Sequence, residues 1–540
     1  MKKLYLLMST ITILFMVSCT GLDLDPTDRV SENAVWESEE TVDAYTTGLY
    51  AHMRDASELY SNNLTDCYSD ILKSASWDQY NHAYNKALLQ VDYFTSTDAG
   101  SLDKWSNYNR IKRQNEFLRD APSMGAHLGQ DFIKIRIAEA RFIRAYAYFE
   151  MARVYGGVVI RDETDGLDGR DQKDKARATE AETWDFILND LQLAAQDLPA
   201  KWDSEWTGRA TKAAAYGLLS RCALYAKKWD IAIEAAKNTK LAGAKLITSS
   251  YADVFTTPLE SNSEVLFAVD FADPIVHNFD RYYRPSGDVD VYSAAAPTSE
   301  LVDSYEMADG TAFSWSTHGT NPYVGREPRF YASILYNGAL WEGRTIQSYV
   351  GGTDGYLEWK PAGATTSTVT GYYIRKYLQE GNNYLTNQST QFDIFIRYAE
   401  VLLNQAEALA EQSYSQNKAD ALAALNEVRN RVGLPGITET QASDKDSFMT
   451  YLRHERMVEL AFEGFRYWDI RRWRLAESVI NGKTAHGVKI TKNSDGSFSY
   501  QQVDCDGGQT RYFDSKYYLM SIPESERLNN SLIGENNPGW

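Results

Sequence analysis

The sequence predicts a mostly α fold, in which tetratricopeptide-like helical hairpins pack against an irregular, loop-rich lobe with small β elements. Three observations predict it. Between Asp131 and Tyr155, apolar residues recur on one face at helical spacing. Between Ala210 and Lys240, small residues recur where two short helices must touch, as in tetratricopeptide hairpins with their period of about 34 residues. From Tyr251 to Gln391, short aromatic and β-branched runs alternate instead with Gly, Pro, Asn and Asp.

Helical periodicity continues on both sides of this lobe. The expected helices cover residues 33–54, 105–118, 131–155, 178–198, 210–227, 230–240, 396–412 and 417–432. Val265–Phe271 is an expected strand, and the polar residues 478–516 resemble a hairpin. We therefore expect one interwoven globule over 31–540, with helical parts at about 31–245 and 392–475, the lobe at about 251–391, and an irregular C-terminal part at 476–540.

A stretch rich in charges and aromatic rings, Arg453–Trp473, follows the last expected hairpin, and we call it the clasp. As one helix it would align an i, i+4 ladder of glutamates, which repel one another. Arg456 and Arg466 lie three residues from Glu459 and Glu463, so the clasp predicts an ion-pair network. A solvated helix face is the alternative. The aromatic rings favour a partly buried junction with an architectural role.

The composition is that of an ordinary globular protein, with 24% charged and 43% hydrophobic residues. A net charge of −19 argues against nucleic acid or an anionic membrane surface as the main partner. The 36 Tyr and 13 Trp residues are many, and those in polar loops suggest a surface on which ligands stack. Cys67, Cys222 and Cys505 match neither a zinc pattern nor an obvious disulfide framework, and no metal or other cofactor is predicted.

The N-terminus predicts export. Two lysines precede an apolar run, Leu4–Val17, that is short for a membrane span and suits a signal peptide. The following Ser18-Cys19 resembles the cleavage site of bacterial lipoproteins. Residues 1–18 are then expected to be removed, and Cys19 to carry the lipid at the start of a tether over 19–30. A plain secretory signal with an incidental cysteine is the alternative.

A series of short motifs runs across most of the chain: Ala138–Ala145, Tyr155-Gly156-Gly157, Pro297–Met307, Arg326–Phe330, Arg397–Leu403, Asn426–Arg429, the clasp, Ile522-Pro523-Glu524 and Asn537–Trp540. In this order, behind a lipoprotein signal, they resemble the SusD/RagB family of outer-membrane lipoproteins. Trp540 departs from the Tyr that is more usual at the end. The resemblance implies four tetratricopeptide-like hairpins against the lobe, and a lipid anchor in the outer membrane with exposure at the cell surface.

The resemblance also implies a function. Such proteins act as lids on a SusC-like TonB-dependent outer-membrane transporter and capture oligosaccharide or polysaccharide for import. Their helical side usually faces the transporter, and the irregular lobe carries the ligand site. Some relatives serve peptide import, so a lid for peptide cargo, or a scaffold, is the alternative. Exposed aromatic side chains in the lobe would favour glycan, and in a helical groove they would favour peptide.

Sugar rings have apolar faces and hydroxyl rims, so a glycan site needs flat aromatic rings beside Asn, Asp, Gln or Arg. The candidates for stacking and hydrogen bonding are Trp77, Asp78, Tyr80, Asn81 and Tyr84 in an early loop, and Tyr283, Arg284, Trp315 and Trp341 in the lobe. Core packing is the alternative role, above all for Tyr283 and Trp341. A surface glycoside hydrolase would need two carboxylates, which 74 Asp and Glu residues always offer. No HExxH, GxSxG or P-loop motif occurs, so no catalytic residue is predicted.

Overall fold

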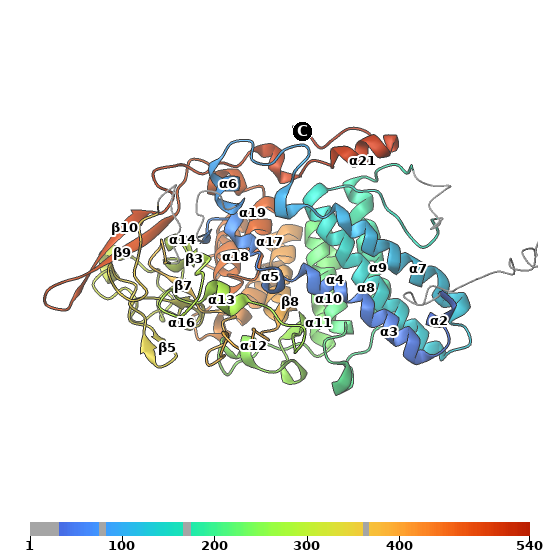
Figure 1. Ribbon diagram of the computed structural model, residues 1–540, viewed down its shortest axis with the longest axis horizontal. Helices are drawn as coiled ribbons and strands as arrows, with labels where there is room; N and C mark the ends of the chain where they lie inside the picture. The colour runs from blue at the N-terminus through green and yellow to red at the C-terminus, as the bar shows by residue number, and fades with distance from the viewer. Residues whose placement is uncertain (1–31, 75–82, 166–173, 360–366) are drawn as a thin grey trace, which may run out of the picture.

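Helices dominate the fold, and the strands form only two-stranded pairs in the computed structural model, which describes residues 32–74, 83–165, 174–359 and 367–540. The first helices lie at one end, the irregular lobe with a β-hairpin at the other, and the later helices between them (Figure 1). This is the mostly α fold that the sequence predicts. The predicted signal peptide, Cys19 and the tether lie outside the described residues. Within those residues, no helix is long and apolar enough to cross a membrane.

The first helical part is built from antiparallel neighbours. Its helices are α2 (Glu32–Val35), α3 (Glu39–Leu49), α4 (Ala51–Ala56), α5 (Glu58–Ser61), α6 (Ala83–Leu89), α7 (Tyr108–Met124), α8 (Gln130–Tyr155), α9 (Glu180–Asp197), α10 (Lys212–Tyr225) and α11 (Trp229–Leu241). The buried helix α8 packs against α7 and α9, and α10 packs against α9 and α11. A capping box between Thr179 and Glu182 begins α9. The helices predicted at 131–155, 178–198 and 210–227 are confirmed to within two residues at each end.

The lobe consists of short elements: α12 (Asp253–Thr256), β2 (Val265–Val269), α13 (Phe279–Tyr283), β3 (Ala295–Pro297), α14 (Ser299–Val302), α15 (Trp315–His318), α16 (Pro328–Ser333), β4 (Ile334–Leu335), β5 (Leu340–Trp341), β6 (Arg344–Thr345), β7 (Tyr373–Ile374) and β8 (Asp393–Arg397). Strand β2 pairs antiparallel with β8. Helix α10 approaches this pair so closely that a Cβ on Gly217 would lie 2.7 Å from Ile396 and 3.1 Å from Leu266. The glycine therefore permits the contact that joins the lobe to the first helices.

The later helices are α17 (Tyr398–Arg431), α18 (Lys445–Glu459), α19 (Arg466–Arg472) and α20 (Ala476–Ile480). The two helices predicted at 396–412 and 417–432 meet within α17 at Ser413, where the backbone leaves helical geometry with φ −170° and ψ 94°. The hairpin predicted within residues 478–516 is confirmed as a β-hairpin, in which β9 (His486–Lys492) pairs with β10 (Phe498–Asp504). Helix α21 (Glu524–Asn529) near the C-terminus lies back against the first helices (Figure 1).

The three cysteines in the described residues, Cys67, Cys222 and Cys505, are buried and unpaired. Within the same ranges, no group of three or more His, Cys, Asp or Glu side chains is arranged to hold a metal ion.

The clasp is not one helix, which corrects the prediction. Helix α18 ends at Glu459, and a turn with φ of 65° at Phe462 and 71° at Gly464 leads into α19. This turn wraps a buried carboxylate, because the backbone N–H groups of Phe462 and Arg466 donate to Asp66 at 3.0 and 3.1 Å. Periodicity could not reveal the turn, since Asp66 lies 396 residues before Phe462 in the chain.

The glutamate ladder does form an ion-pair network, with partners from distant parts of the chain. Glu459 accepts hydrogen bonds from Arg397 at 2.7 Å, from Arg329 at 3.0 Å and from Arg431. The other two glutamates are held in the same way: Glu455 by Arg329 and Arg429, and Glu463 by Arg397 and Lys376. Burial acts to raise the pKa of Glu459, but the charges of Arg431, Arg397 and Arg329 hold that pKa well below 4.5.

The sequence predicted that Arg456 and Arg466 would pair with the glutamate ladder. In the structure they pair with other carboxylates. Arg456 donates to Asp469 at 2.8 Å, and Arg466 binds Asp70 through two hydrogen bonds of 2.8 Å. The turn after α18 carries Arg466 away from the helix face, so the ladder meets arginines of the lobe and of α17 instead. The architectural role of the clasp is confirmed, and its partners differ from those predicted.

A partly buried acidic group beside the clasp, Glu58, predicts a pH dependence of stability. Burial raises the pKa of Glu58 to about 8, and the charges of Asp66 and Asp393 add to this rise. The folded protein keeps the Glu58 proton at pH values where the unfolded chain has released it. Stability from this group is therefore complete below about pH 4.5 and is lost as the pH rises towards about 8. We expect Glu58→Gln to make the decline in unfolding free energy between pH 5 and pH 8 shallower, as measured by urea denaturation.

A matched control is Glu524→Gln, because Glu524 is exposed on α21. This variant should keep the pH dependence of the wild type. Equal slopes for the wild type and Glu58→Gln would contradict the assignment.

Candidate functional site

The nine predicted ligand-binding residues do not form one cluster among the described residues. Trp77, Asp78, Tyr80 and Asn81 lie outside them. Tyr84, Tyr283, Arg284 and Trp341 are buried below the surface where α6 and α13 lie, and Trp315 is partly exposed elsewhere.

The described residues on either side of positions 75–82 lie close together. Strand β1 (Leu72–Ser74) pairs antiparallel with β3, with Ser74 opposite Ala295. In an antiparallel pair one strand ends where the other begins, so the chain leaves β1 beside the residues that lead into β3, including Tyr292. The chain returns to the same place, because Asn85 in α6 donates to the carbonyl oxygen of Ser74 at 3.3 Å.

Tyr84 and Tyr283 support this region from below. Their exposed fractions are 5% and 3%. The Tyr84 hydroxyl donates to Asn63 Oδ1, and the Tyr283 hydroxyl donates to the carbonyl oxygen of Asn62 at 3.0 Å. Both tyrosines thereby fasten their helices, α6 and α13, to the turn after α5. This arrangement fits the packing alternative for Tyr283.

Arg284 and Trp341 are fully buried and share one carboxylate. The Arg284 guanidinium lies 4.9 Å from the Trp341 ring centre. Asp288 accepts from Arg284 Nε at 3.1 Å, from Trp341 Nε1 at 3.1 Å and from Arg344 at 2.7 Å. Because its ring is enclosed, Trp341 packs beneath the surface of the lobe. This is the core-packing role that the sequence left open for this residue. A direct ligand contact by Arg284 or Trp341 stays a prediction.

Three partly exposed tyrosines lie near these buried residues, together with an arginine and an aspartate. We call the five residues the 281–292 surface, although one of them comes from a later loop: Arg281, Tyr282, Asp290, Tyr292 and Tyr384. Tyr282 and Tyr292 have ring centres 5.0 Å apart, and the Arg281 guanidinium lies 5.5 Å from the Tyr292 ring. Arg281 also donates to Asp290. Tyr384 is held by its hydroxyl, which donates to the carbonyl oxygen of Val289, and by the Arg284 guanidinium 4.5 Å from its ring. Ring faces beside an arginine and a carboxylate suit the apolar faces and hydroxyls of a sugar.

The sequence prediction missed Tyr282 and Tyr292, although a signal for Tyr282 was present. In a short helix, residues four apart share a face, so Tyr283 lies with Phe279, and both are buried. The preceding Tyr282 then points outward and stays partly exposed. Tyr292 carried no such signal, because it lies outside any helix or strand, and a backbone hydrogen bond from its N–H to the carbonyl oxygen of Arg281, 3.0 Å long, holds it beside Tyr282.

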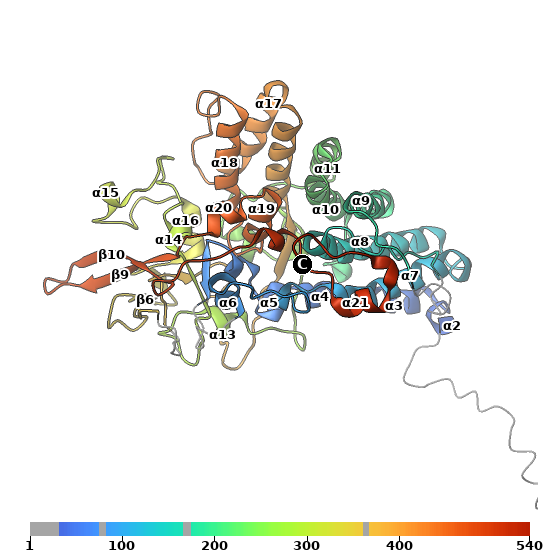
Figure 2. The same ribbon diagram turned by 90° about the horizontal axis from the view of Figure 1, so that it is seen from above.

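Trp315 belongs to a second aromatic cluster. Its Nε1 donates to Asp303 at 2.8 Å, and its ring lies 5.4 Å from Phe313 and 6.0 Å from Tyr500 in the β-hairpin. Burial raises the pKa of Asp303 to about 6, against the opposing effect of the Trp315 hydrogen bond. Figure 2 shows α15 and α13 on opposite sides of the β9–β10 hairpin, so Trp315 does not join the 281–292 surface.

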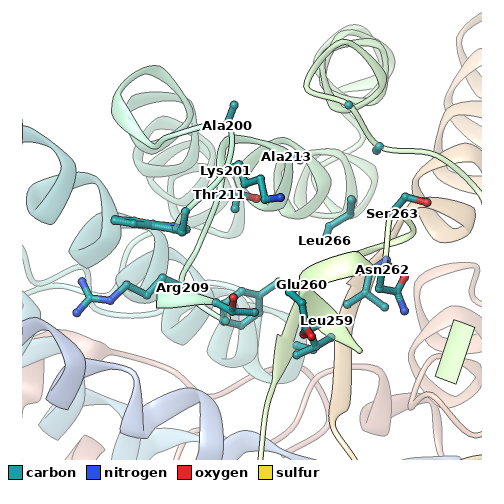
Figure 3. A pocket seen from close by; sticks show the side chains of 18 of the residues that line it. Ala200, Lys201, Arg209, Thr211, Ala213, Leu259, Glu260, Asn262, Ser263 and Leu266 are labelled. Carbon is teal, nitrogen blue, oxygen red and sulfur yellow. Dashed lines mark hydrogen bonds between the residues drawn. The ribbon is translucent and has the colours of Figure 1, made fainter. Parts of the chain in front are cut away.

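A cavity of about 550 Å³ lies between residues 200–213 of the first helical part and residues 259–268 of the lobe. Figure 3 shows Lys201, Thr211 and Ala213 on one side of this cavity and Leu259 and Glu260 on the other. Trp202 also lines it, with the guanidinium of Arg136 5.2 Å and that of Arg209 5.6 Å from its ring. Partly exposed aromatic rings therefore occur in the helical part as well as in the lobe.

Paired helices that carry an aromatic, loop-rich lobe define the class of SusD-like proteins. The family model described as the SusD family matches residues 263–540. A second model, described as starch-binding and associating with the outer membrane, matches residues 22–224. The chain belongs to the SusD family.

Individual relatives agree with this assignment. A SusD-like protein of Bacteroides ovatus is 23% identical over 99% of this chain and 98% of the relative. The crystal structure of a SusD-like protein from Bacteroides fragilis has a TM-score of 0.81 at 29% identity, covering 95% of this chain and 100% of that one. A SusD-like carbohydrate-binding protein from the same species has a TM-score of 0.77 at 25% identity, covering 92% and 99%. The family and fold predicted from the motifs are confirmed.

Proposed function

We propose that the protein captures oligosaccharide or polysaccharide at the cell surface and delivers it to a SusC-like TonB-dependent outer-membrane transporter. Family membership supports this, together with relatives described as carbohydrate-binding and a family model described as associating with the outer membrane. A lipid on Cys19 would anchor the protein to the outer membrane. In this proposal the helical side faces the transporter and the lobe faces the glycan.

One observation carries the location of the glycan site. The register of β1 against β3 sets Ser74, the last described residue before positions 75–82, opposite Ala295, which follows Tyr292 by three residues. The predicted early-loop residues follow Ser74 by three to seven positions in the chain: Trp77, Asp78, Tyr80 and Asn81. In this proposal one glycan contacts both the predicted residues of the early loop and the exposed rings of the lobe.

The first test is affinity electrophoresis of the protein, from Asp23 onward, in gels that contain plant, host or microbial polysaccharides. We expect one class of glycan to retard the wild type. Trp77→Ala should weaken that binding by about tenfold, equivalent to roughly 1.4 kcal/mol, because it removes one stacking ring. The melting temperature should stay that of the wild type.

The matched control is Trp206→Ala, which removes a partly exposed ring from the helical part, where it stacks 4.3 Å from the Arg209 guanidinium. It should leave retardation unchanged. Equal retardation of Trp77→Ala and the wild type would remove the early loop from the site.

A lid for peptide cargo is the second candidate, and the cavity beside Trp202 is the observation that favours it. No retardation by any polysaccharide, together with binding of extended peptides that Trp202→Ala weakens, would establish this alternative. A surface glycoside hydrolase has no support from a catalytic motif. Release of reducing ends from a bound polysaccharide would establish it.

A further inference from the structure

A groove of about 810 Å³ lies between α7, the segment around Val159–Asp165, and α21. Its volume is within the range of about 300–1,000 Å³ that is usual for small-ligand sites. No residue of the 281–292 surface lines it. Figures 1 and 2 both show α21 beside α7, at the opposite end of the molecule from the lobe.

An aromatic ring in the groove is held in a fixed position. Tyr108 is partly exposed, and its hydroxyl donates to the carbonyl oxygen of Val159 at 2.7 Å. Its ring makes an edge contact with Trp105 at 5.2 Å. A ring that is already ordered loses little conformational entropy when a ligand stacks on it.

A buried donor without an acceptor also lines the groove. Asn115 is 1% exposed, and its Oδ1 accepts from Arg144 at 2.8 Å, which fixes the orientation of the amide. The Nδ2 group has no hydrogen-bond partner among the described residues. An unsatisfied buried donor costs about 1–3 kcal/mol, so an acceptor supplied by a ligand would be favoured here.

The remaining polar side chains point to an uncharged ligand. The amides of Asn109 and Asn529 stand on the α7 and α21 walls, and both are exposed. The charged groups are balanced: Lys112 and Arg161 against Asp103 and Glu526, with Asp165 already paired to Lys175 at 2.8 Å. A charged ligand would meet repulsion as well as attraction, whereas hydroxyl groups can bond to amides and to both kinds of charge.

We propose that this groove is a second carbohydrate-binding site, which takes a short, neutral stretch of glycan. The inference rests on the proposed function and adds a contact outside the lobe. Figure 2 shows α6, α13 and α21 along one side of the molecule, with α17 and α18 on the other. One polysaccharide chain can therefore engage both sites, and two linked contacts bind more tightly than either does alone.

The test is titration calorimetry of the full chain from Asp23 with maltotetraose, cellotetraose, laminaritetraose and xylotetraose. With the tetrasaccharide that binds, we expect two sites in the wild type and one in the double variant Asn109→Ala/Asn529→Ala. Trp77→Ala should weaken binding at the other site by about tenfold and leave binding in the groove unchanged. Asn115→Asp keeps the acceptor for Arg144 but removes the unpaired donor, and it should also lose the groove site.

The control Gln416→Ala changes an exposed amide on α17, on the far side of the molecule, and should keep two sites. A single site in the wild type that the double variant leaves unchanged would overturn this inference and leave the proposed function intact. Absence of binding for all four tetrasaccharides, and of retardation by every polysaccharide, would overturn both.

Discussion

Glu459→Ala is expected to lower the free energy of unfolding by about 3–5 kcal/mol, because it leaves buried arginines without their shared partner. Arg397, Arg431 and Arg329 all bind this carboxylate, and Glu459 is fully buried. Their remaining partners cannot replace it, since Glu264, Glu455 and Glu463 are already paired. Urea denaturation followed by tryptophan fluorescence measures the change.

The matched control is Glu439→Ala. Its carboxylate is 74% exposed and lies 3.9 Å from Lys418, so the change should stay within about 0.5 kcal/mol. A loss as small for Glu459→Ala as for the control would mean that the network contributes little to folding.

Gly157→Ala is expected to destabilise the fold by about 3 kcal/mol or more. A Cβ at this position would lie 2.1 Å from the carbonyl oxygen of Ala178 and 2.9 Å from the carbonyl carbon of Thr179. Both obstacles are backbone atoms, so no side-chain rotation relieves the overlap. The segment before α9 must stay close, because the N–H of Ala178 donates to the Val158 carbonyl at 2.9 Å. The midpoint of urea denaturation should fall accordingly.

Glycine-to-alanine substitution at Gly48 should instead stabilise the fold. Gly48 lies in α3, is exposed, and a Cβ there would meet nothing within 4 Å. Alanine is the better helix former by about 0.8–1.0 kcal/mol, so Gly48→Ala should raise the midpoint. Destabilisation of similar size at both glycines would show that close backbone contact is not the cause at Gly157.

The long helices could be predicted because their signals are local. The apolar stripe of α8 and the caps at its end and at the start of α9 are contained in neighbouring residues. The course of the clasp could not be predicted. The turn after α18 depends on Asp66, and the ladder depends on Arg329 and Arg397, all of them distant in the chain. Hydrophobic periodicity carries no information about such contacts.

The candidate site was harder to predict for the same reason. The sequence shows that the lobe is rich in aromatic residues, but it does not show which of their rings are buried. Trp341 is covered because Arg284 and Asp288 close around it, whereas Tyr292 stays partly exposed where its backbone bonds to Arg281. Trp315 was predicted to bind the ligand together with Trp341, yet it packs against the β-hairpin in a different place. Exposure was decided by tertiary contacts in each case.

Among the described residues, the ion-pair network attaches the lobe to the later helices through five side chains of the lobe: Glu264, Glu306, Arg329, Lys376 and Arg397. The architecture persists while the sequence diverges, as the TM-score of 0.81 at 29% identity shows. Tyr282 and Tyr292 lie outside the anchors, so exchange of these partly exposed rings, with the buried Tyr283 and Arg284 kept, is a route to a different sugar preference on an unchanged scaffold.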